Sequence, residues 1–155
     1  MGQTRPTRLD VVRPSRYPGV VLELDVDTLR AVARRYPEAR LVVLFGSVAR
    51  GEAVPWSDAD VGVAGLPFWR GLELGAELGA MVGREVHVID LDSASEALCF
   101  AVAREGILVA EGAPDAWACF QAAAALRWFD LQPIIARCAE GARRALLARG
   151  GRGGG

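Results

Sequence analysis

The sequence predicts a mixed α/β fold, in which a small mixed β-sheet is flanked by helices and followed by a helical C-terminal segment. Short apolar runs that suit strands alternate along the chain with segments of helical periodicity. Hydrophobic residues make up 52% of the 155 residues, which is enough to build one buried core. No internal repeat divides this order, so we expect one folded domain.

The two ends of the chain differ in composition from the part between them. Residues 1–19 combine several arginines with three prolines and few apolar residues, which predicts a flexible arm. Residues 150–155 are nearly all glycine and predict a disordered tail. We therefore expect the folded domain to span residues 20–149.

The first half of the domain predicts one helix and two strands. Asp25 to Asp27 can cap a helix that runs to about Tyr36, where Pro37 ends it. Residues 41–45 form a short apolar run that suits a strand buried on both faces. Residues 60–64 predict a second strand.

The second half predicts a further alternation and then a long helix. The expected elements are a helix over 67–82 that stops at Gly83, a strand over 85–90, a helix over 94–104 capped by Asp92 or Ser93, a strand over 107–109, and a helix over roughly 114–149 that is interrupted or kinked at Pro133. Apolar residues recur at three- and four-residue spacing in this last helix: Trp117, Phe120, Ala124, Trp128 and Leu131. This stripe predicts core packing or, where it stays exposed, contact with a second subunit in a homo-oligomer.

Composition excludes several classes of protein. The 18 Lys and Arg against 19 Asp and Glu give a net charge of −1, which argues against a binder of long nucleic acid. No apolar run reaches the roughly 18 residues of a membrane helix, and no signal peptide is evident, so a cytoplasmic protein is expected. Three widely spaced cysteines, Cys99, Cys119 and Cys138, predict buried thiols in a reducing compartment rather than a zinc site or disulfides.

The chemistry is predicted between residues 41 and 63. A buried strand runs into Gly46 and Ser47, where glycine lets the backbone approach a ligand and free amides can hold phosphate oxygens. Asp58 and Asp60 stand two positions apart on a strand and therefore project from the same face. Two adjacent carboxylates repel each other unless a cation lies between them, and Mg²⁺ prefers such oxygen ligands. The pattern predicts a phosphate cradle facing a metal site.

The string GSVARGEAVPWSDADV, which contains Gly-Ser, ten further residues and Asp-x-Asp, resembles the signature of the DNA-polymerase-β-type nucleotidyltransferase superfamily. The same string is similar to that of the minimal nucleotidyltransferases, whose members act as antitoxins to HEPN-domain toxins. The resemblance implies a nucleotidyltransferase-like fold, metal ligation by Asp58 and Asp60, and transfer of a nucleoside monophosphate, AMP from ATP, to a hydroxyl of a small helical HEPN-type partner. Mg²⁺, or alternatively Mn²⁺, is the implied cofactor. Arg50 and Ser57 also match the family string, and the resemblance implies that Arg50 lies near the triphosphate; an exposed helix arginine is the alternative.

One position departs from the family pattern. A third acidic residue is expected on the strand over 85–90, where this chain has His87, its single histidine. Asp90 lies three residues further and faces the opposite side of the strand. His87 can act as a general base, ligate a softer cation such as Mn²⁺, or serve a structural role. Two functions therefore stay open: an active nucleotidyltransferase, and a degenerate nucleotide-binding module that acts on its partner by contact alone. A small-molecule nucleotidyltransferase is disfavoured by the short chain.

Overall fold

The computed structural model describes residues 25–54 and 57–150, with side chains to residue 147. The expected N-terminal arm lies outside the described residues, as do residues 151–155 of the expected tail. No helix within the described part of the chain is long and apolar enough to cross a membrane.

A four-stranded mixed sheet forms the centre of the domain, as expected, with the strand order β3-β2-β1-β4. Strand β1 (Leu41–Phe45) pairs antiparallel with β2 (Ala59–Ala64) on one side and with β4 (Ile107–Glu111) on the other. Strand β3 (Val86–Asp90) pairs parallel with β2 and forms one edge of the sheet. All five residues of β1 are buried, because this central strand is covered on both faces.

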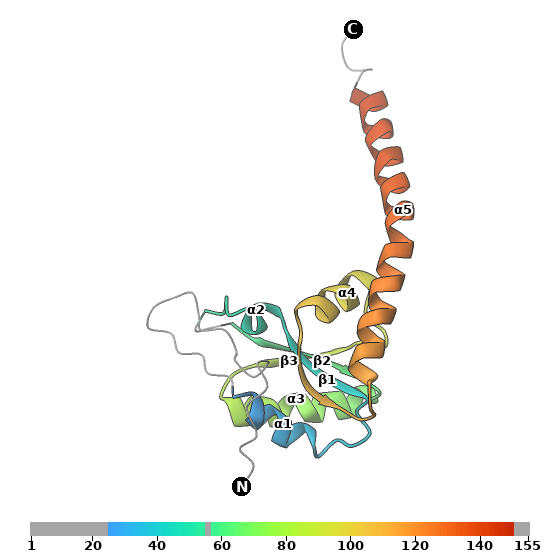
Figure 1. The fold of residues 1–155 in the computed structure, drawn as a ribbon. Helices are drawn as coiled ribbons and strands as arrows, with labels where there is room; N and C mark the ends of the chain where they lie inside the picture. The colour runs from blue at the N-terminus through green and yellow to red at the C-terminus, as the bar shows by residue number, and fades with distance from the viewer. Residues whose placement is uncertain (1–24, 55–56, 151–155) are drawn as a thin grey trace.

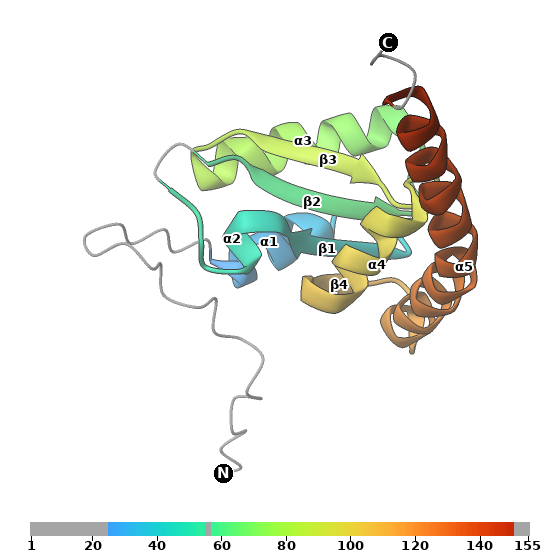
Figure 2. The same cartoon turned by 90° about the horizontal axis from the view of Figure 1, so that it is seen from above.

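Helices cover the two faces of the sheet (Figures 1 and 2). On one face lie α1 (Val26–Ala33) and α3 (Phe68–Val82), whose buried Leu29, Leu74 and Leu78 pack in one cluster with the side chains of Val42 and Leu44. On the other face lie α4 (Glu96–Glu105) and the first part of α5 (Ala116–Gly150), with a cluster that includes Val43, Phe45 and Val102. The short helix α2 (Gly46–Ala49) follows β1 directly.

The ends of two helices differ from the sequence prediction. Asp25 caps α1 as expected, but the helix ends at Ala33 rather than near Tyr36. The cap of α4 is Ser95, whose side chain accepts a hydrogen bond from the Leu98 amide, and neither Asp92 nor Ser93. Both of those side chains are engaged elsewhere: Asp92 pairs with Arg40 and accepts from the Gly65 amide at 2.7 Å, and the Ser93 hydroxyl donates to Asp90 at 2.8 Å.

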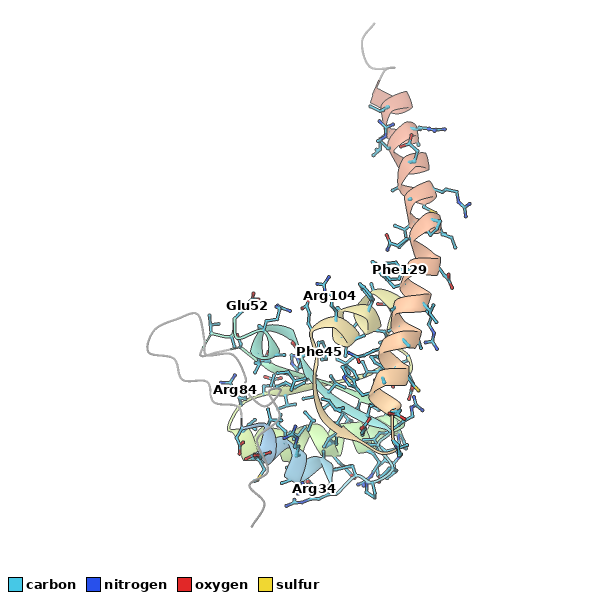
Figure 3. The ribbon with its side chains drawn as sticks, viewed as in Figure 1. Arg34, Phe45, Glu52, Arg84, Arg104 and Phe129 are labelled. Atoms are coloured by element: carbon cyan, nitrogen blue, oxygen red, sulfur yellow. The ribbon has the colours of Figure 1, made fainter. Side chains whose placement is uncertain are left out.

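Helix α5 is continuous, so of the two alternatives expected at Pro133 the interruption is wrong, and the kink stays a prediction. The residues after Pro133 are rich in alanine, leucine and arginine, which favour a helix strongly enough to continue it past one lost hydrogen bond. Helix α5 extends well beyond the sheet in Figure 1. Phe129 lies at the point where α5 runs past α4 (Figure 3).

The first part of α5 packs on the domain, as the apolar stripe predicted. Ala124 is buried, and Trp128 stacks on Phe100 with ring centroids 5.5 Å apart. The prediction of three buried thiols is correct only for Cys99. Cys119 and Cys138 are exposed, because they lie on the solvent-facing side of α5.

Candidate nucleotide site

The turn after β1 is built around a glycine that no other residue could replace without strain. Gly46 has a φ of +76°, and a Cβ at this position would lie 2.3 Å from Oδ2 of Asp60. Both facts require glycine, since a side chain would meet a left-handed backbone and a carboxylate at once. The first turn of α2 is thereby held against the Asp60 carboxylate. Phe45 at its N-cap provides no side-chain hydrogen bond, and Ser47 is half-buried in this turn.

Asp58 and Asp60 lie at the start of β2, one on each side of the buried Ala59. Burial raises the pKa of Asp60, and the nearby His87 partly offsets this rise; the Asp58 carboxylate adds to the rise, and Arg50 acts against it. Repulsion from Asp58 contributes to this rise, so the two carboxylates carry an imbalance of negative charge between them. A cation between the two carboxylates would remove this imbalance.

His87 lies directly across from Asp60 in the parallel pairing of β2 with β3. Its Nδ1 is 3.9 Å from Oδ1 of Asp60, and its Nε2 is 3.9 Å from Oδ2 of Asp58. The position that the family pattern assigns to a third acidic residue therefore does face the two carboxylates, with an imidazole in its place. Asp90, on the same strand, instead accepts hydrogen bonds from the Asp92 amide and the Ser93 hydroxyl.

Glu85 is a further member of the site that the sequence prediction omitted. Its Oε1 lies 3.4 Å from Nε2 of His87. Three ligand atoms, one each from Asp58, Glu85 and His87, lie within 4.8 Å of one another. They are close enough to surround a single ion. Strand alternation could have indicated this residue, because positions 85 and 87 share a face. Carboxylate oxygens suit Mg²⁺, and the imidazole nitrogen adds a ligand that Mn²⁺ accepts more readily, so the donor set fits a divalent cation.

Arg50 and Ser57 lie around this centre without touching the carboxylates. Arg50 follows α2 and donates to Glu52 at 2.8 Å and to Glu105 at 3.2 Å, and these hydrogen bonds raise its pKa. The Ser57 hydroxyl accepts from the Val54 amide at 2.9 Å, so it closes the turn that enters β2.

Arg84 supports the same turn from the other side by donating to the Ser57 carbonyl at 3.0 Å. Glu52 and Arg84 both lie at the α2 end of the sheet (Figure 3). The parts that surround the two aspartates thus come from the loop before β2, the start of β3, α2 and α4.

The comparison with known protein families decides the identity of this fold. Residues 27–115, which include β1 to β4 and the whole site, match the family described as polymerase beta, nucleotidyltransferase. The chain belongs to this nucleotidyltransferase family. The expected fold is confirmed, and the resemblance of the Gly-Ser and Asp-x-Asp string is confirmed with it. No curated protein sequence matches the chain.

Solved structures similar to this nucleotidyltransferase include several toxin–antitoxin complexes. A toxin–antitoxin structure with AMP-PNP is 25% identical, with a TM-score of 0.67, over 77% of this chain and 99% of that chain. A complex of the MNT antitoxin with a tri-AMPylated HEPN toxin of Shewanella oneidensis is 23% identical, with a TM-score of 0.62, over 79% and 99%. A further toxin–antitoxin structure, MntA–HepT, is 23% identical with a TM-score of 0.62, over 78% and 98%. Almost the full length of each of these chains thus has a counterpart in this nucleotidyltransferase.

Proposed function

We propose that this protein is a metal-dependent nucleotidyltransferase that transfers AMP from ATP to a hydroxyl of a HEPN-type toxin, and so acts as its antitoxin. The observation that carries the proposal is that Asp60 lies against the glycine turn at Gly46, while His87 lies 3.9 Å from both Asp60 and Asp58. Two similar structures support it, one described as a toxin–antitoxin with AMP-PNP and the other as an MNT antitoxin with an AMPylated HEPN toxin. Since ATP is the expected substrate, we place the protein in the cytoplasm.

Each part of the site has a role in this reaction. The amides around Gly46 and the Ser47 hydroxyl would hold triphosphate oxygens. Asp58 and Asp60 would hold Mg²⁺, which neutralises charge on the phosphates when it is bound. Arg50 lies close enough to lower the pKa of Asp60 and supplies positive charge on the side of α2. Ser57 would act by fixing the loop that carries Asp58, since its hydroxyl already closes the turn to Val54.

The transfer exchanges one phosphorus–oxygen bond for another. The hydroxyl oxygen of the acceptor forms a bond to the α-phosphorus, the bond from that phosphorus to the bridging oxygen breaks, and pyrophosphate leaves with its electron pair. The hydroxyl proton passes to His87 or to solvent. His87 stands where the family pattern has a third carboxylate, and a neutral imidazole can accept this proton through a ring nitrogen.

Incubation with labelled ATP, Mg²⁺ or Mn²⁺, and the HEPN-type partner tests the proposal. Wild type should label the partner, and Asp58→Asn with Asp60→Asn should abolish labelling. Asp90→Asn is the matched control, because it removes a carboxylate from the other face of β3 and should leave labelling unchanged.

His87 favours the second candidate function, a module that binds nucleotide and neutralises its partner by contact alone. If His87 has only replaced a catalytic carboxylate, transfer should be slow and His87→Asp should accelerate it. If His87 is the working base, His87→Ala should abolish transfer. If wild type and His87→Asp both bind ATP but neither labels the partner, the contact-only function is established and the transferase is contradicted.

A further inference from the structure

The outer edge of β3 offers unpaired backbone groups. The Glu85 carbonyl accepts from the Ala59 amide at 3.0 Å, and the Leu91 amide donates to the Val63 carbonyl at 2.8 Å, so these alternate residues direct their backbone toward β2. Val86 and Val88 lie between them and therefore direct their amides and carbonyls away from the sheet. Among residues 25–54 and 57–150, no strand pairs with this edge. Such an edge is a template for an added strand.

A hollow of about 280 Å³ lies along this edge, between β3 and α3. Helix α3 runs alongside β3 in both views (Figures 1 and 2). Gly75 brings the helix close, since a Cβ there would lie 2.9 Å from Cγ2 of Val88, and Gly71 lies next along the same side. Leu72 borders the hollow and is 58% exposed, with the exposed Phe68 at its end. We name this surface the β3 groove; it is lined chiefly by Gly71, Leu72, Gly75, Gly79, Val86 and Val88.

The β3 groove and the candidate nucleotide site share one residue, Glu85, at the start of β3. The lining of the groove ends at Arg84 and Glu85, and Glu85 is the residue whose carboxylate lies 3.4 Å from His87. The groove follows the face of β3 that carries Val88, whereas His87 projects from the opposite face. The groove and the site therefore flank the same strand.

A strand added to β3 would use both faces at once. Successive side chains of such a strand point alternately to the two faces, and residues directly opposite each other have Cβ atoms about 4.5–5.5 Å apart. A residue opposite His87 would therefore present its side chain beside His87, whose ring nitrogens lie 3.9 Å from the carboxylates of Asp58 and Asp60. Its neighbours on either side would point toward the apolar β3 groove.

We propose that the β3 edge and groove bind the acceptor as an extended segment, in which a hydroxyl residue is flanked on both sides by apolar residues. This inference rests on the proposed transfer to a protein hydroxyl and names the part of the surface that recognises it. The backbone of β3 provides affinity through strand addition, and Leu72 with the glycine floor selects the apolar neighbours. The register places the hydroxyl beside His87, the group that the proposed transfer uses to accept its proton.

Proline at position 88 tests the strand addition. Val88→Pro removes an amide that points away from β2, so the pairing within the sheet is kept, and proline is tolerated at such edge positions. Val88→Ala is the matched control, because it also shortens the side chain but keeps the amide. The probe is a fluorescein-labelled peptide with the sequence Lys-Thr-Val-Tyr-Val-Thr-Lys, whose binding is measured by anisotropy without ATP. We expect Val88→Pro to weaken binding at least tenfold and Val88→Ala less than threefold.

A second pair of variants tests the groove without altering β3. Leu72→Arg places a charge on the groove wall and should weaken peptide binding at least fivefold. Met81→Arg is its control, since Met81 lies on the same helix with a similar exposure of 56% but does not line the groove. A peptide in which the tyrosine and one valine exchange places should bind more weakly, and be labelled less, than the original peptide.

The outcomes separate this inference from the proposed function. Peptide binding that depends on the amide of residue 88, without any labelling by ATP, would keep the docking surface and reject the transferase. Labelling of the partner that is equal in Val88→Pro and Val88→Ala would reject the docking surface and keep the transferase. Three outcomes would each overturn the inference. The wild type could fail to bind the peptide, or both members of either pair of variants could lose peptide affinity equally. The wild type could also be a dimer that Val88→Pro converts to a monomer, which would make a second copy the occupant.

Discussion

Replacement of Gly46 by alanine should damage both the fold and the nucleotide site. A left-handed backbone costs an alanine about 1–2 kcal/mol, and Gly46 has a φ of +76°. The new Cβ would also lie 2.3 Å from Oδ2 of Asp60, so this carboxylate must rotate away from its position. A side chain forced from its rotamer costs about 0.5–1.5 kcal/mol more. We therefore expect a total loss of about 1.5–3.5 kcal/mol in the free energy of unfolding.

Gly83 provides the matched control for this substitution. It has a similar φ of +68°, and a Cβ there would meet nothing within 4 Å. Gly83→Ala should therefore cost only the backbone contribution of about 1–2 kcal/mol. In an Asp60→Ala background, the cost of Gly46→Ala should fall toward this value, since the carboxylate is gone.

Urea unfolding of the protein without ligand measures these free energies, and calorimetric titration with ATP and Mg²⁺ measures nucleotide binding. Gly46→Ala should lose most of its affinity for ATP, whereas Gly83→Ala should keep that of wild type. Equal unfolding free energies for the two variants, together with unchanged ATP affinity in Gly46→Ala, would refute the reasoning from the close approach of Gly46 to Asp60.

Three further predictions concern charge and packing. The pKa of Asp60 is raised above 3.8 in the folded state, so folding takes up protons and the free energy of unfolding falls as the pH rises through this raised value. Asp60→Asn should therefore raise the melting temperature of the ligand-free protein at pH 7, and this gain should disappear below pH 3.8. Unchanged melting at pH 7 would contradict it. Leu74→Ala should cost about 2–5 kcal/mol in urea unfolding, because Leu74 is 0% exposed, whereas Leu72→Ala should stay within about 0.5 kcal/mol. Arg50→Met should change the free energy of unfolding by less than about 1 kcal/mol, since both ion pairs of Arg50 are solvent-accessible. The same substitution should weaken ATP binding roughly tenfold, or about 1.4 kcal/mol. Unaltered ATP affinity would show that Arg50 is only a surface arginine.

The sequence by itself determined the local parts of the site. An apolar run followed by glycine indicated a buried strand and a tight turn, because few residues tolerate such a turn. The spacing of Asp58 and Asp60 indicated one shared face, because side chains alternate along a strand whatever it pairs with. The same rule correctly separated His87 from Asp90.

Only the tertiary structure decided which distant residues meet. Alternation fixes the face of a side chain but not the neighbouring strand or its register, and the parallel pairing of β2 with β3 is what brings His87 opposite Asp60. The same pairing adds Glu85 to the site, and within the described part of the chain no strand pairs with the other edge of β3, beside α3. The cap of α4 was likewise missed, and the sequence left open whether α5 continues past Pro133, because each depends on competing contacts or on the whole helix rather than on one residue.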